Sequence, residues 1–120
     1  MRDILNTFGT VTTSSANAAK AFDNGVDTLT ANGLGIIDNL YVKAKIQTKA
    51  PGNEAIIITV KHGADTATMN ALVAETFPAR PWAIGDELKV KIPAEHLRYL
   101  TLEVATTTTG VGFTAYLERG

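Results

Sequence analysis

Two histidines, His62 and His96, are the first residues in this 120-residue sequence whose types could do chemistry. In the run His62-Gly-Ala-Asp65 an imidazole and a carboxylate stand near each other at a turn, which is the start of a metal site. A zinc site needs three or four ligands, and the chain has no cysteine and no third histidine to complete one. We therefore expect no metal here and interpret His62 as a surface histidine beside a turn aspartate.

The carboxylates and serines offer no catalytic arrangement either. Asp86 and Glu87 are adjacent, and neighbouring residues on a strand point to opposite faces, so they do not form an acid–base pair. Ser14 and Ser15 are the only serines, and their Thr/Ala-rich surroundings lack a nucleophile elbow. We expect a protein that is not an enzyme, with no catalytic residue, no cofactor and no small-molecule substrate.

The segment Gly33-Leu34-Gly35 has the start of a dinucleotide-binding fingerprint. That fingerprint needs a third glycine where Asp38 stands, with a strand before it and a helix after it. Here the segment leads into a strand at residues 40–48 instead. We interpret it as a backbone bend rather than a phosphate site.

Composition narrows the class of partner. The net charge is −1 and the isoelectric point is about 6.1, which gives no electrostatic footprint for nucleic acid or an anionic membrane. Hydrophobic residues make up 45% of the chain, as in a folded globular domain, yet no apolar run approaches the ~20 residues that span a bilayer. The lack of cysteine excludes disulfides and weakly favours synthesis in a cytosol.

A predicted β-hairpin at residues 40–62 organises the chain. In Leu40–Thr48 apolar and polar residues alternate with period two, which predicts one buried face and one solvent face. Pro51-Gly52-Asn53 has turn chemistry. The second arm, residues 55–62, is β-branched almost throughout, and we expect burial on both of its faces, including Ile57 and Thr59.

Other segments also have strand patterns, and none has a long helical period. Alanines and a serine cap would permit a short helix at residues 14–22, although an extended segment is favoured there, and Asp65 could cap a single helical turn. The predicted strands lie at 87–92, 99–105 and 111–118, with extended segments at 14–22 and 72–77. Prolines 78 and 81 exclude residues 77–82 from a central strand. These patterns predict an all-β fold of about seven or eight antiparallel strands, a single-domain β-sandwich or jelly roll over residues 14–120.

The residues before this domain, 1–13, are expected to form an N-terminal arm. Its apolar residues are Ile4, Leu5 and Phe8. The arm is either a loosely held terminus or a segment that docks on a neighbouring subunit. Later in the chain, Trp82 and Ile84 are expected to seal one end of the core.

Charged and aromatic residues fall on predicted solvent faces. Four lysines, Lys43, Lys45, Lys89 and Lys91, occupy outward positions of two strands and would form a mild basic stripe if those strands share a sheet. Solubility and edge protection are the favoured interpretation of these lysines. Tyr41 and Tyr116 are also expected on solvent faces.

Soft motifs spread along most of the chain resemble those of the jelly-roll cement (decoration) proteins of tailed bacteriophage capsids. They are an extended Ser/Thr/Ala segment ending at 23–25, a Gly-x-Gly bend at 33–35, Leu40-Tyr41-Val42, a strand ending at 60–65, the run 98–102, and Thr114-Ala115-Tyr116-Leu117. The start of the chain and the segment 78–82 depart from the family pattern.

The resemblance implies a structural virion protein that is made in the bacterial host cytoplasm and binds the outside of the capsid. Such a protein bridges neighbouring major capsid proteins, and its other partner is itself, as a homodimer or homotrimer, so that many weak contacts add up. We predict interface contacts through Ile4, Leu5, Phe8 and Trp82, with the arm and the loops at one end touching the shell. The alternative is a carbohydrate- or cell-surface-binding β-sandwich module, which would expose several aromatics.

Overall fold

The computed structural model describes residues 7–14, 16–22, 25–27, 40–93 and 97–119. Within them the chain is all-β, with nine strands and no helix. The strands are β1 (Thr7–Thr12), β2 (Lys20–Ala21), β3 (Val26–Asp27), β4 (Leu40–Thr48), β5 (Glu54–Gly63), β6 (Asn70–Arg80), β7 (Glu87–Lys91), β8 (Tyr99–Thr106) and β9 (Gly112–Arg119). The prediction of an all-β, single-domain sandwich is confirmed.

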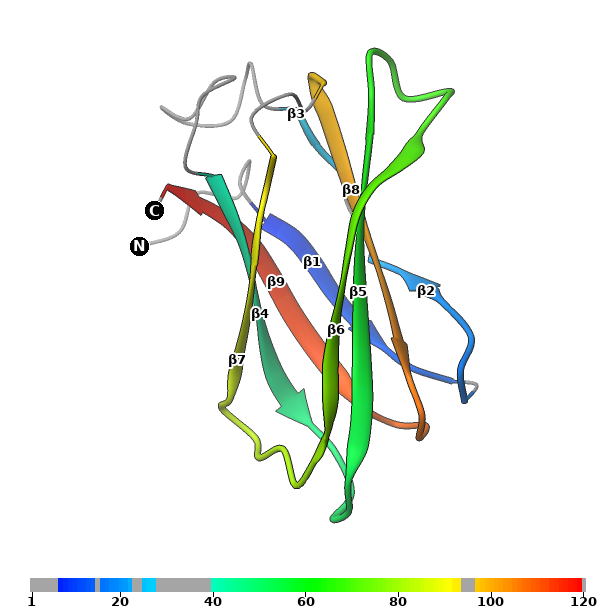
Figure 1. The fold of residues 1–120 in the computed structure, drawn as a ribbon, viewed down its shortest axis with the longest axis vertical. Coiled ribbons are helices and arrows are strands. Elements are labelled where there is room, and N and C mark those ends of the chain that lie inside the picture. The colour runs from blue at the N-terminus through cyan, green and yellow to red at the C-terminus, as the bar shows by residue number, and fades with distance from the viewer. Residues whose placement is uncertain (1–6, 15, 23–24, 28–39, 94–96, 120) are drawn as a thin grey trace.

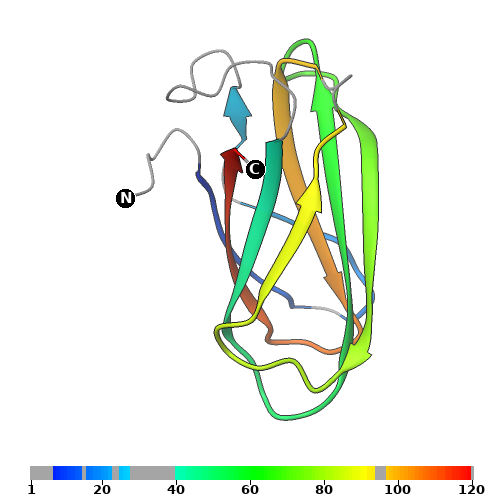
Figure 2. The ribbon, with the colours of Figure 1, turned by 60° about the vertical axis from the view of Figure 1, so that its left-hand side comes forward.

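The strands form two antiparallel sheets that face each other, as Figures 1 and 2 show. One sheet has the order β1-β9-β4-β7, and the other has the order β2-β8-β5-β6, with β3 also paired to β8. If β2 and β3 are counted as one interrupted strand, the orders become 1-8-3-6 and 2-7-4-5. Each sheet then mixes strands from both halves of the chain, and this is the strand order of a jelly roll.

Period-two alternation accounts for the core. On β4 the burial alternates in the predicted register, and the same holds on β7, β8 and β9. The inward side chains of both sheets interdigitate in one cluster, which is the main favourable contribution to folding. Its largest fully buried members are Phe8, Phe113, Leu40, Ile46, Ile56, Ile58, Leu88, Ile92, Leu100, Leu102 and Leu117.

Strand β5 does not follow its predicted burial on both faces. Ile56, Ile58 and Val60 are fully buried, whereas Ile57 keeps 40% of its surface exposed and Thr59 is half-buried. The prediction was wrong because nothing in the described chain covers the outer face of this sheet, so its central strand is packed on one side only. In this protein the run of β-branched residues therefore indicates a central strand, and it does not indicate that both faces of that strand are buried.

The N-terminal segment differs from the predicted arm of residues 1–13. Its described part forms β1, which pairs with β9 in a sheet, and Phe8 is fully buried in the core. Thr13 continues into hydrogen bonds with Val111 and Gly110, so residues 7–13 belong to the sandwich. Ile4 and Leu5 lie outside the described residues.

Two other local predictions differ from the structure. Among the described residues of the segment 14–22, the one strand is β2, and Asn17 turns the chain before it with a φ of 61°. Asp65 does not cap a helical turn: its Oδ1 accepts hydrogen bonds from the amides of Ala67 (2.9 Å) and Thr68 (3.0 Å) within the β5–β6 turn. The bend at 33–35 lies outside the described residues, and the prediction about it stays a prediction.

Candidate functional site

The two ends of the sandwich are built differently. The β4–β5 and β6–β7 connections meet at one end, at the bottom of Figure 1. The β5–β6 turn and β3 meet at the other end, at the top of Figure 1. We call the first the sealed end and the second the open end, because their side chains are arranged in opposite ways.

At the sealed end the indole of Trp82 closes the core. Its Nε1 donates a hydrogen bond to the carbonyl of Glu54 (3.0 Å), Phe77 meets the ring edge-on at 6.2 Å between centroids, and the guanidinium of Arg80 lies 4.2 Å over it. The prediction that Trp82 caps the core is confirmed. Ile84 does not share this role, since 63% of its surface is exposed on the β6–β7 connection.

The sealed end also contains a buried ion pair that was not predicted from the sequence. The Nζ of Lys49 is 2.9 Å from Oε1 of Glu54, and the two side chains are only 6% and 1% exposed. Lys49 also donates to the carbonyls of Gly52 and Trp82, so its ammonium joins both connections of the sealed end. Glu54 Oε1 has no hydrogen bond of good angle from the described residues, so the pair is held mainly by charge. This arrangement ties loops together and is structural.

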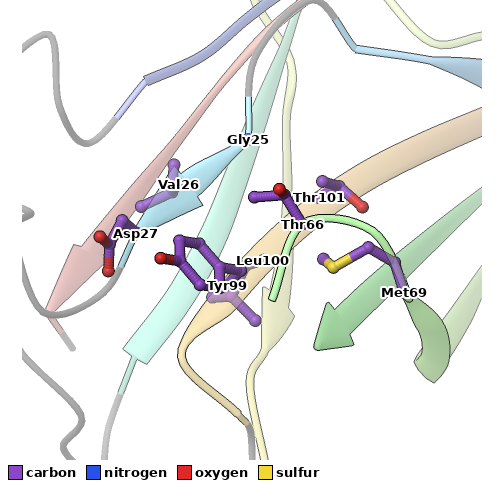
Figure 3. A pocket seen from close by; sticks show the side chains of 8 residues that line it. All are labelled: Gly25, Val26, Asp27, Thr66, Met69, Tyr99, Leu100 and Thr101. Atoms are coloured by element: carbon purple, nitrogen blue, oxygen red, sulfur yellow. The ribbon is translucent and has the colours of Figure 1, made fainter. Parts of the chain in front are cut away.

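The open end carries a pocket of about 250 Å³ (Figure 3). Three separate parts of the chain line it: the edge strand β3, the start of β8 and the β5–β6 turn. Its lining residues are Gly25, Val26, Asp27, Thr66, Met69, Tyr99, Leu100 and Thr101. In Figure 3 Tyr99 and Met69 lie on opposite sides, with Thr66 between them, so apolar walls meet hydroxyl groups.

One wall of the pocket is fixed by an ion pair. Arg98 holds Asp27 with two parallel contacts, Nε to Oδ1 and Nη2 to Oδ2, each 2.8 Å long. The hydrogen bond to the Asp27 carboxylate raises the pKa of Arg98 above its ordinary value. The same guanidinium lies 4.9 Å over the ring of Tyr99, so Asp27, Arg98 and Tyr99 form one connected unit at the rim.

The opposite wall depends on a tight turn after β5. A Cβ on Gly63 would lie 2.3 Å from the Thr68 carbonyl oxygen and 2.7 Å from Met69 Sδ, so only glycine allows this close approach. His62 is held nearby, since its Nδ1 accepts a hydrogen bond from the Leu97 amide (3.0 Å). His62 and Asp65 thus have structural partners, and no three carboxylates and histidines gather among the described residues.

The outer faces of the two sheets differ in charge. On the β1-β9-β4-β7 sheet, β4 and β7 are neighbours, so the lysine stripe forms as the sequence analysis allowed: Lys43 lies opposite Lys89. The ring of Tyr41 lies beside these lysines, with its centroid 4.3 Å from Lys89 Nζ and 5.9 Å from Lys91 Nζ. Lys43 also pairs with Glu118 at 3.1 Å. This face therefore carries several charged side chains.

The outer face of the β2-β8-β5-β6 sheet has small, uncharged residues around Ile57. Ile57 lies opposite Ala105 of β8 and Thr76 of β6, and at the next outward position Thr59 lies between Ala74 of β6 and Glu103 of β8. A shallow hollow of about 110 Å³ lies beside Ile57, lined by Asn17, Ala55, Ala105, Thr106 and Thr107. Within this part of the face the one ion pair between described strands is Lys61–Glu103 (2.9 Å). We call the set Ala55, Ile57, Thr59, Ala74, Thr76 and Ala105 the Ala/Thr face.

Of the interface residues predicted from the sequence, the two that the structure describes do not lie on either outer face. Phe8 belongs to the core and Trp82 to the sealed end, and both are buried within the chain. Contact with another protein concerns a partner that a single chain does not contain, so their interface role stays a prediction. The residues of the pocket and of the Ala/Thr face were not predicted as sites, since each set comes from strands far apart in the sequence.

Comparisons with known proteins give little to transfer. No protein-family model and no curated protein matches the chain. Among solved structures the chain is similar to the CBM22-1–GH10 modules of endo-1,4-β-D-xylanase 10B from Clostridium thermocellum, complexed with xylohexaose. The match has 13% sequence identity and a TM-score of 0.42, and it covers 96% of this chain but 27% of that chain. A likeness at this level assigns neither a family nor a ligand.

The described part of the chain contains no helix of the length and apolar character that crossing a membrane requires.

Proposed function

We propose that the protein is a structural virion protein that binds the outer surface of a bacteriophage capsid. In this proposal it bridges neighbouring major capsid proteins and stabilises the shell, and it associates with itself as a homodimer or homotrimer. The resemblance to jelly-roll cement proteins motivates the proposal. The jelly-roll strand order supports it at the level of the fold.

The single observation that carries the proposal is the Ala/Thr face. The cores of protein interfaces are depleted of charged residues. The cross-strand neighbours of Ile57 are uncharged, with the Lys61–Glu103 pair at the edge of this set, whereas the opposite outer face has the lysines. A large apolar side chain that is 40% exposed at its centre would gain from being covered. We therefore place the shell against the Ala/Thr face rather than against Phe8 and Trp82.

The test is binding to purified capsids that lack this chain. Adding the protein is expected to raise the temperature and the salt stress that the shells survive. Ile57→Lys is expected to weaken shell binding at least tenfold, because it puts an unpaired charge in the contact, which costs about 2 kcal/mol or more.

The matched control is Gln47→Lys, which adds the same charge at an exposed position on the charged outer face. It is expected to bind like the unmodified protein. Shells whose heat and salt tolerance does not change with bound protein would contradict the stabilising role. Equal binding by both variants would contradict the assigned face.

A second candidate function is binding to a carbohydrate or a cell surface. The pocket at the open end favours it, because an aromatic ring, hydroxyl groups and a carboxylate line a volume of about 250 Å³ there. An array of immobilised glycans, probed with the intact protein, tests this candidate independently of capsids.

A further inference from the structure

We propose that the pocket at the open end binds one ring of a neutral sugar, with Tyr99 as its apolar wall, Thr66 and Thr101 as partners for the hydroxyl groups, and Asp27 at the rim beside Tyr99. This inference rests on the second candidate function and not on the capsid role. It names the class of ligand and the residues that would recognise it.

The size of the pocket limits the ligand to something small. Pockets that enclose drug-sized molecules have volumes of about 300–1,000 Å³. The pocket here is about 250 Å³, below that range, and it is bounded by β3 on one side and the β5–β6 turn on the other. A single six-membered sugar ring suits such a space, whereas a long oligosaccharide would have to extend beyond it.

The chemistry of the walls selects a ring with one apolar face. Tyr99 and Met69 give the pocket its accessible apolar walls, whereas Val26 and Leu100 also line it but are buried in the core. A pyranose carries C–H groups on its faces, and these can pack against an aromatic ring as other apolar groups do. Arg98 lies over the Tyr99 ring outside the pocket lining and holds that ring in place.

The polar groups at the rim match hydroxyls rather than a charged group. A hydroxyl both donates and accepts, and the hydroxyls of Thr66 and Thr101 do the same. The Asp27 carboxylate accepts hydrogen bonds, and its negative charge is already paired with Arg98 at 2.8 Å. An acidic ligand would compete with Asp27 for Arg98, so a neutral sugar is favoured.

The walls are held in position within the described chain. The Asp65 carboxylate fixes the turn that carries Thr66 through two amide hydrogen bonds, and Gly63 brings that turn close to the sheet. The Arg98–Asp27 pair fixes the other side. A site that needs little rearrangement loses less free energy of ordering when its ligand binds.

The experiment is a titration of the ¹⁵N-labelled protein with neutral methyl glycosides of glucose, galactose, mannose and xylose, followed by NMR. A ligand of this size is expected to bind with a dissociation constant of about 1–10 mM. The amide signals of Gly25, Tyr99 and Thr101 should shift most. Tyr99→Ala should weaken binding at least tenfold, and Thr66→Trp, which fills the pocket from an exposed turn, should abolish it.

The matched control is Tyr116→Ala, which removes a half-buried tyrosine from the other outer face and should leave the titration unchanged. The inference is overturned if no glycoside shifts the pocket signals at about 50 mM, or if Thr66→Trp binds normally. Shell binding of Thr66→Trp separates the two proposals. If sugar binding fails while that variant still stabilises shells, only the sugar site is lost.

Discussion

The two ends of the sandwich differ in where their charged side chains lie. At the sealed end the charged groups are buried, where Lys49 pairs with Glu54 and the indole of Trp82 bonds the Glu54 carbonyl. At the open end the polar groups stay at the rim, where Asp27 and Arg98 pair beside an accessible pocket. Charge that is buried and matched ties loops together, whereas charge that remains accessible can meet a ligand.

This difference predicts that substitutions at the two ends have separate consequences. Changes at the sealed end should lower the free energy of unfolding and leave the pocket intact. Changes at the open end should alter the pocket at a smaller cost in stability. The effect of a substitution at either end can therefore be compared with that of a matched substitution elsewhere in the fold.

The largest effect is expected from Lys49→Met. It leaves the carboxylate of Glu54 buried without its cation, which costs about 3–5 kcal/mol in the free energy of unfolding. Adding Glu54→Leu to this variant should recover most of the loss, because two apolar side chains can replace a buried ion pair. Urea denaturation of the single and double variants measures both values.

Lys61→Met is the matched control for that experiment. Its pair with Glu103 has the same 2.9 Å distance, but the two side chains are 33% and 27% exposed. Solvent screens such a pair, so the loss should stay below about 1 kcal/mol. Equal losses for Lys49→Met and Lys61→Met would show that burial does not distinguish the sealed end.

The next effect is expected from Gly63→Ala at the open end. The new Cβ would meet the backbone oxygens of Thr68 and Asp65 at 2.3 and 2.8 Å, so the β5–β6 turn must move. Such overpacking costs about 1–3 kcal/mol. NMR shifts should spread through Thr66 and Met69 while the Trp82 indole signal stays in place. Gly52→Ala, at the sealed end, has open space around its Cβ and serves as the comparison, although its φ of 140° strains an alanine.

Much of the fold could be predicted because alternation is a local signal. On β4, β7, β8 and β9 each inward residue is two positions from the next, so the buried set was readable from the sequence. The burial of Ile57 was mispredicted for a physical reason. A run of β-branched residues is compatible with one covered face or two, and only the sheet order decides which.

The sites could not be predicted because they depend on long-range placement. Asp27, Thr66 and Tyr99 come from three elements, and no spacing pattern joins them before the chain folds. Lys49 and Glu54 are close in sequence, yet Trp82, which bonds to both residues, comes from a later connection. Trp82 alone could be placed, since a single tryptophan next to prolines favours an end of the core.

The smallest effect concerns Lys43 and Glu118 on the charged outer face, and it is a pH effect. Their hydrogen bond raises the pKa of Lys43 above its ordinary value of 10.5. A cation whose pKa is raised on folding contributes stability that is complete below pH 10.5 and lost as the pH rises through the folded-state pKa. The pair is exposed, at 23% and 29%, so the contribution is small.

Glu118→Gln should therefore lower stability slightly at about pH 8 and lose this effect as the pH rises above about 11. Urea denaturation at both pH values measures the difference. In a Lys43→Met background, Glu118→Gln should have no such pH dependence, which assigns the effect to this pair and not to other groups that ionise at alkaline pH. A difference as large as that of Lys49→Met would mean that pairing, rather than burial, gives a Lys–Glu contact its strength, and the contrast with the sealed end would fail.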